Sequence, residues 1–117
     1  MTTMNQKLIS MAYEAFNERN IDKILPLLHK DVHWPNGWEG GYVDGHDAVR
    51  AYWTRQWKEI DPKVIPVSFE EKETGQIAVS VRQNVKDLRG NLLLEGMIRH
   101  VYTIEDNLIK SMEIEKG

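Results

Sequence analysis

Cysteine is absent from this chain of 117 residues. Its absence excludes disulfides, thiol nucleophiles and thiolate metal ligands, and it suits a reducing cytoplasm, which is the location we expect. Long apolar runs are also missing, and none reaches the roughly 18 to 20 residues of a membrane span. The opening segment MTTMNQKLISMAYEAF has neither the basic start nor the long apolar middle of a secretory signal. We therefore expect no membrane association.

Basic charge is scarce as well. The chain has 15 lysine and arginine residues against 18 acidic ones, a net charge of −3. Its lysines are scattered singly among acids, as at Lys58, Lys63 and Lys72. Proteins that bind nucleic acid usually present a basic face, because neutralising phosphates dominates their affinity. Nucleic acid is therefore not an expected partner.

The first half of the chain is expected to be helical. Its length suits one domain covering residues 1–117. Apolar side chains recur at helical spacing over residues 8–16, 21–28 and 49–60, which predicts three helices. Pro26 should kink the second one, because proline removes a backbone donor. The predicted N-caps are Thr2 or Thr3, Asn20 and Asp44.

The second half changes to the spacing of strands. Four alternating segments between residues 63 and 115 are separated by the turn sequences TG, RGN and EDN, which predicts an antiparallel meander. Pro66 indicates that the first of these strands lies at an edge or carries a bulge. A short strand, DVHW at 31–34, precedes the third helix. Helices followed by strands imply the α+β class.

The strand predicted at 92–104 is apolar on both faces. One face carries Leu94, Ile98, Tyr102 and Ile104 together with His100, and the other carries Leu93, Met97, Arg99 and Val101. A strand of this kind is covered on both sides, and an open sheet often achieves this by dimerisation. We expect a homodimer formed through the sheet. The alternative is that a helix covers one face.

Three segments, read in order, resemble a known family. They are AFNERNIDKILPLLHKDVHW, GHDAVRAYW and RHVYTIEDNLIKSMEIE, and together they are similar to the nuclear transport factor 2-like superfamily in its SnoaL-like, ketosteroid-isomerase-like branch. The resemblance spans nearly the whole chain. It implies a cone-shaped, curved, mostly antiparallel sheet wrapped around the N-terminal helices, a cystatin-like roll with an internal pocket. Members include isomerases, polyketide cyclases, epoxide hydrolases, dehydratases and non-enzymatic proteins that bind small apolar molecules, often as homodimers.

The catalytic residues that this resemblance would carry over are not matched. An ungapped count places Asn36 at the general-base aspartate of the ketosteroid isomerases, Ala12 at their oxyanion tyrosine and Arg99 at their protonated aspartate. Asparagine cannot accept a proton at neutral pH, so steroid isomerisation is not expected. The Asp–Arg–Asp set of the epoxide hydrolases also fails, because Val101 stands where an acid is required after Arg99.

A candidate pocket follows if Arg99 points inward. Alternation then places Met97 beside it on the same inward face. The same alternation on the first strand makes Trp34 and Asn36 point inward. The predicted ligand-binding residues are Trp34, Asn36, Trp38, Tyr42, Trp53, Trp57, Met97 and Arg99. This set suits a small apolar molecule with a carbonyl or carboxylate. If the protein is catalytic, Asn36 and Arg99 are the candidate residues. The general base is then unassigned, with Glu39, Asp44 and Glu95 as candidates.

Several alternatives remain open at this point. Trp53 and Trp57 could be core residues, and Arg99 could pair with an acid such as Glu95. No histidine pair has the spacing of a metal site, so neither a metal nor another cofactor is expected. Histidine catalysis at His100 would require the strand register to be shifted by one residue.

The sequence therefore favours a SnoaL-like domain that binds a small molecule without catalysis. The alternative is an enzyme of the isomerase, polyketide cyclase or dehydratase type acting on a small apolar carbonyl compound. A third hypothesis, a protein-interaction module, is less favoured, because the aromatic residues fit a pocket better than an exposed patch.

Overall fold

The computed structural model describes residues 4–116, and the predicted caps Thr2 and Thr3 lie outside this range. Four helical segments are present: α1 (Met4–Asn17), α2 (Ile21–Ile24), the 3₁₀ turn η1 (Leu25–Leu27) and α3 (Gly45–Glu59). They are accompanied by β1 (Leu28–Pro35), β2 (Tyr42–Asp44), β3 (Ile60–Glu71), β4 (Ile77–Asp87), β5 (Leu92–Glu105) and β6 (Leu108–Lys116). The α+β prediction is confirmed.

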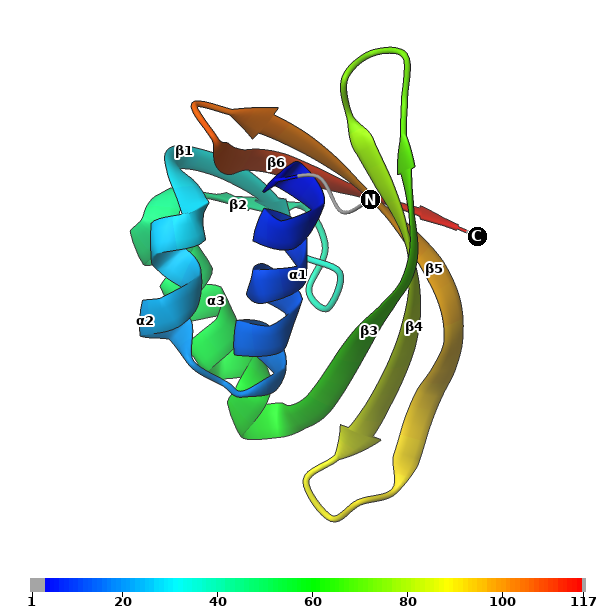
Figure 1. Ribbon diagram of the computed structural model, residues 1–117. Coiled ribbons are helices and arrows are strands. Elements are labelled where there is room, and N and C mark those ends of the chain that lie inside the picture. The colour runs from blue at the N-terminus through cyan, green and yellow to red at the C-terminus, as the bar shows by residue number, and fades with distance from the viewer. Residues whose placement is uncertain (1–3, 117) are drawn as a thin grey trace.

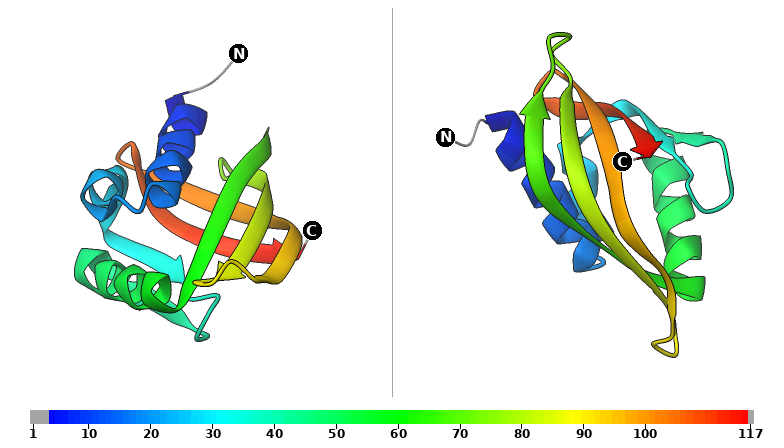
Figure 2. Two further views of the ribbon diagram at one scale, coloured as in Figure 1. Left: turned by 90° about the horizontal axis from the view of Figure 1, so that it is seen from below. Right: turned by 90° about the vertical axis from the view of Figure 1, so that its right-hand side faces the viewer.

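All the strands join one sheet in the order β2-β1-β6-β5-β4-β3. Neighbouring strands are antiparallel except β1 and β6, which run parallel. The long strands β3, β4 and β5 bend around the helices, and α1 and α3 lie on the concave side of the sheet (Figures 1 and 2). This is the predicted curved sheet wrapped around N-terminal helices.

Two local predictions about proline are confirmed. Strand β3 lies at the edge of the sheet, and its pairing with β4 shifts register between Pro66 and Ser68. The second predicted helix is short: α2 ends at Ile24 and continues as a 3₁₀ turn that contains Pro26. Proline has no N–H to donate, so the helical ladder cannot continue through it.

Of the two predicted caps in the described residues, one caps its helix through its side chain and the other does not. The Asn20 side chain accepts a hydrogen bond from the Lys23 N–H at 3.2 Å, as predicted for a cap of α2. Asp44 precedes α3 but makes no side-chain capping bond, because its carboxylate contacts His33 instead. The short strand β2, which ends at Asp44 and pairs with β1, was not predicted.

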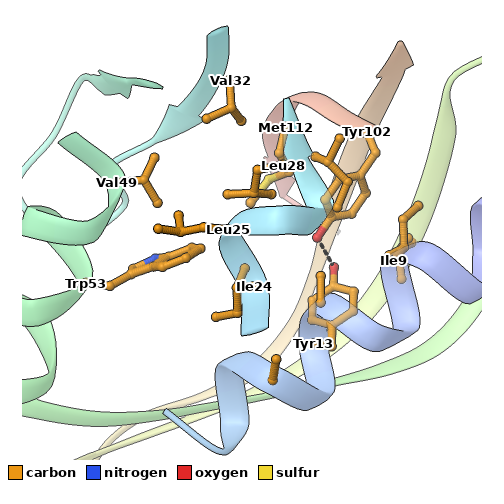
Figure 3. Close-up of a cluster of buried hydrophobic side chains, with 14 of the residues drawn as sticks. Ile9, Tyr13, Ile24, Leu25, Leu28, Val32, Val49, Trp53, Tyr102 and Met112 are labelled. Atoms are coloured by element: carbon orange, nitrogen blue, oxygen red, sulfur yellow. Dashed lines mark hydrogen bonds between the residues drawn. The ribbon is translucent and has the colours of Figure 1, made fainter. Parts of the chain in front are cut away.

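The hydrophobic core fills the space between the helices and the concave face of the sheet. Its largest fully buried side chains are Trp53, Tyr102, Ile9, Ile24 and Leu28. Figure 3 shows Trp53 of α3 and Tyr102 of β5 among the aliphatic side chains of α2, η1 and β1. No helix in the described part of the chain is long and apolar enough to cross a membrane.

The face of β5 that points inward is the opposite of the one used to predict the pocket. Tyr102 pairs with the fully buried Ile77 and His100 with the fully buried Val79, so His100 and Tyr102 face the concave side. Arg99 then faces the convex side, because side chains alternate along a strand. The expected inward orientation of Arg99 was therefore wrong by one residue.

Candidate functional site

A cavity of about 650 Å³ lies between the helices and the concave face of the sheet. This volume is within the range of small-molecule sites. Aromatic and aliphatic side chains dominate its wall. The aromatic members are Tyr13 and Phe16 of α1, Trp34 of β1, Trp38 of the following loop, Tyr52 and Trp53 of α3, and His100 and Tyr102 of β5.

No aspartate, glutamate, lysine or arginine is among the described residues that line this cavity. Its polar side-chain groups are the hydroxyls of Tyr13, Tyr52 and Tyr102, the imidazole of His100, the amides of Gln56 and Gln83, and the indole N–H groups of the lining tryptophans. A buried charge needs a partner or a hydrogen-bonding shell, and this wall offers no opposite charge. The site therefore suits an uncharged molecule.

A chain of three hydrogen-bonded side chains lies in the cavity wall. The Tyr102 hydroxyl donates to the Tyr13 hydroxyl oxygen at 2.7 Å, and Tyr13 lies 2.7 Å from Nδ1 of His100. Figure 3 shows the two tyrosines facing each other from α1 and β5. Because Tyr13 accepts from Tyr102, its own proton is free to go to Nδ1. In the tautomer that accepts this proton, His100 carries its own proton on Nε2.

Burial keeps this cluster uncharged. Desolvation lowers the pKa of His100 to about 4, so the imidazole is neutral at physiological pH. The same desolvation raises the pKa values of Tyr13 and Tyr102, with the neighbouring phenol adding to the rise at Tyr13. A neutral imidazole N–H is a hydrogen-bond donor that suits a carbonyl or hydroxyl oxygen.

Three of the predicted tryptophans line the cavity: Trp34, Trp38 and Trp53. Trp34 and Trp53 meet edge to face with ring centroids 5.4 Å apart, and Trp53 is only 2% exposed, so it belongs to both wall and core. Trp57 lies outside the wall. It stacks on Trp53 and packs edge to face against Phe16, which makes it a packing residue.

The loop between β1 and β2 holds Trp38 at the cavity edge, where this side chain is 37% exposed. Asn36, predicted to orient a ligand, instead organises the loop. Its side-chain oxygen accepts from the backbone N–H groups of Trp38 and Glu39, and its amide donates to the Glu39 carboxylate. Arg55 of α3 donates to the same carboxylate at 2.8 Å. Asn36 does not line the cavity.

The remaining predicted site residues lie on the outer surface. Arg99 contacts Glu70 at 3.2 Å and Glu115 at 3.7 Å across the convex face, as the ion-pair alternative anticipated, although with different acids. Met97 is 46% exposed on the same face. Tyr42 donates to Glu113 at 2.7 Å and stacks on His33.

The three candidate bases also lie away from the cavity. Glu39 pairs with Arg55, Asp44 contacts His33, and Glu95 accepts from Asn84 at 2.8 Å. Among the described residues no group of three or more histidine and acidic side chains is arranged to hold a metal ion.

The predicted site left out Tyr13 and His100, and a role for His100 was considered only with the strand register shifted by one residue. Each lies one position after a residue assigned by the ungapped count, Ala12 and Arg99 respectively. The signal was present, since His100 shares a strand face with Leu94, Ile98 and Tyr102, and a polar residue on an apolar face requires a partner.

The comparisons with known proteins bear on the family and the fold. The model of the SnoaL-like domain family matches residues 9–112. A search of the curated proteins finds no match.

Solved structures share the fold closely. TerC, co-crystallised with polyporic acid, is 25% identical, with 98% of this chain and 92% of TerC covered and a TM-score of 0.84. A candidate polyketide cyclase from Xanthomonas campestris is 16% identical, with 97% and 90% covered and a TM-score of 0.82. A Mycobacterium tuberculosis protein in complex with estradiol-17β-hemisuccinate is 16% identical, with 94% and 91% covered and a TM-score of 0.80. The match over residues 9–112 establishes that the chain belongs to the SnoaL-like family, and the curved sheet that it shares with a solved NTF2-like protein places it in the nuclear transport factor 2-like fold.

Proposed function

We propose that this protein binds a small, uncharged, largely apolar molecule and holds one of its oxygen atoms at His100. A single observation carries the proposal: the 650 Å³ cavity has an aromatic wall without a charged residue, and the His100 imidazole lines it beside the Tyr13 hydroxyl. The ligand-bound relatives support small-molecule binding in this fold, because TerC was crystallised with polyporic acid.

The neutral wall narrows the expected ligand. A carbonyl or carboxylate was expected opposite Arg99, but that guanidinium lies on the convex face, paired with Glu70. A carboxylate in the cavity would lose its hydration without gaining a cation, which is costly. A carbonyl or hydroxyl oxygen loses less and can accept from His100.

Matched probes test this proposal. We expect 2-acetylnaphthalene to quench tryptophan fluorescence on binding, since Trp34 and Trp53 line the cavity, and we expect 2-naphthoate to bind at least tenfold more weakly at neutral pH. His100→Phe keeps an aromatic ring but removes the donor, and should weaken binding of the ketone roughly five- to tenfold. Equal affinity for the ketone and the carboxylate would contradict the proposal.

A catalytic role is the second candidate, and the Tyr102–Tyr13–His100 chain is the observation that favours it. Such a chain can stabilise negative charge developing on a carbonyl oxygen, as isomerases, cyclases and dehydratases require. No described carboxylate lines the cavity to act as a strong general base. Steroid isomerisation through an aspartate is therefore still not expected, and binding without catalysis is the preferred function.

Dimerisation through the sheet is also part of the proposal. The convex face carries exposed apolar side chains on the two strands that flank β4, Ile65 of β3 at 53% and Met97 of β5 at 46%. Both pair in register with Arg82 of β4, so they form one row across the sheet. A second copy placed against this row would cover it.

A further inference from the structure

We propose that the cavity has a second polar contact, formed by Gln83 and supported by Gln56, and that the ligand is an elongated, rigid molecule with an oxygen near each end. This inference rests on the proposed function, since it describes how the same cavity recognises its ligand.

The register fixes the separation of the two polar positions. On β4, Gln83 lies four residues after Val79, and Val79 is the cross-strand partner of His100. Four residues of strand span about 13 Å. The pair between these positions, Val81 and Ile98, is apolar. The cavity therefore offers a polar group, an apolar stretch and a second polar position along one direction of the sheet.

Gln83 has the properties of a ligand contact. Its side chain lines the cavity and makes no hydrogen bond within residues 4–116. Its partner on β5 is Gly96, where an added Cβ would meet no atom within 4 Å, so open space lies beside the amide. Unpaired amides on a concave apolar wall are uncommon unless water or a ligand completes them.

Gln56 adds a second amide to this half of the cavity. It lies on the last turn of α3, four residues before β3 begins at Ile60, and it also lines the wall. Its Nε2 is 3.2 Å from the Tyr52 hydroxyl, while its Oε1 is buried without a hydrogen-bond partner in the described residues. Turning the amide over would exchange the two atoms, and one of them would still lack a partner.

The two ends also differ in access. His100 is 6% exposed, whereas Leu93 and Leu94, which line the cavity near the β4–β5 turn, are 56% and 52% exposed. A ligand thus reaches His100 with its buried end and leaves its other end near Gln83. The spacing selects a molecule long enough to reach both, of the length of a biphenyl or a fused polycycle with terminal oxygens.

A symmetric probe binds equivalently in either orientation. Biphenyl-4,4′-diol carries two terminal hydroxyls, and biphenyl-4-ol carries only one. For the unaltered protein, tryptophan fluorescence titration should show the diol bound roughly five- to tenfold more tightly than the mono-ol. In Gln83→Leu combined with Gln56→Leu, the ratio of the two dissociation constants should fall towards one.

Asn84→Leu provides the matched control, because Asn84 is the next residue on β4 and its amide donates to Glu95 on the opposite face. This change should leave the ratio as it is in the unaltered protein. Equal affinity for the diol and the mono-ol, or a ratio that survives both glutamine substitutions, would overturn the second contact while leaving the proposed function standing. Binding of neither probe would contradict the proposed function itself, and this inference with it.

Discussion

At the scale of single residues, the most informative side chain is His100. It lies among apolar neighbours, yet it is not an isolated polar group, because Tyr13 and Tyr102 complete its hydrogen bonding. The cost of burying three polar side chains is offset only while all three remain paired. Such a cluster is held in one arrangement, which fixes the orientation of the His100 imidazole towards a ligand.

This burial gives the protein a pH-dependent stability. The pKa of His100 is lowered to about 4 in the folded protein by desolvation, against an ordinary value near 6.5. Between these values the unfolded chain binds more protons, so the free energy of unfolding should be highest above pH 6.5 and fall as the pH decreases towards 4. The loss attributable to this group is roughly 3 kcal/mol.

Urea denaturation at a series of pH values measures this dependence. His100→Asn should flatten the profile between pH 4 and 6.5 relative to the unaltered protein, because it removes the titrating group. His46→Asn is the control, since that imidazole lies at the start of α3 and contacts the Leu28 carbonyl instead. An identical fall in both variants and in the unaltered protein would show that other groups cause it.

The tryptophans separate packing from binding. Trp57→Ala should cost roughly 3 to 5 kcal/mol in the free energy of unfolding, because the ring stacks on Trp53, packs against Phe16 and lies under the Arg19 guanidinium. Trp38→Ala, at the exposed cavity edge, should change stability by less than about 1 kcal/mol and weaken binding of 2-acetylnaphthalene. Thermal denaturation and fluorescence titration measure the two effects, and a reversed order would make Trp38 the packing residue.

At the scale of elements, the sequence predicts where strands lie better than it predicts which face of each strand points inward. Alternation predicted strands β3 to β6. Pro66 indicated an edge strand or a bulge, and β3 lies at the edge with a register shift beside Pro66. Alternation divides a strand into two faces but does not say which face the helices cover. On β1 the fully buried Val32 marks the inward face, and Trp34, two residues later, lines the cavity.

Both faces of β5 carry apolar residues, so the inward face was assigned from an assumed role for Arg99. That assignment was wrong. A shift of one residue moves every side chain of a strand to the other face, so Met97 and Arg99 both lie outside the cavity. The prediction for Asn36, in the loop after β1, failed for another reason. Asn36 uses its side chain to bond the N–H groups of Trp38 and Glu39, and a local bond of this kind competes with any ligand.

At the scale of the whole molecule, the two faces of the sheet serve different purposes. The concave face and the helices enclose the cavity, and the convex face presents a row of exposed apolar and charged side chains. Arg99 bridges Glu70 and Glu115 across β3, β5 and β6, which braces the convex surface without closing it. An exposed apolar row on an open sheet is a usual site of association between copies.

This arrangement predicts a homodimer whose contact is centred on Met97. Met97→Glu places a carboxylate in the row formed with Arg82 and Ile65, and burying that charge against a second copy would be unfavourable. Light scattering coupled to size exclusion should give the mass of two chains for the unaltered protein and of one chain for Met97→Glu at the same micromolar concentration. Thr54→Glu, on the exposed side of α3, should leave the dimer intact.

Because Met97 lies on the convex face, Met97→Glu should still bind 2-acetylnaphthalene, provided the cavity is complete within one chain. A one-chain mass for the unaltered protein would rule out this dimer at that concentration, and loss of both dimer and binding would mean that the second copy completes the cavity.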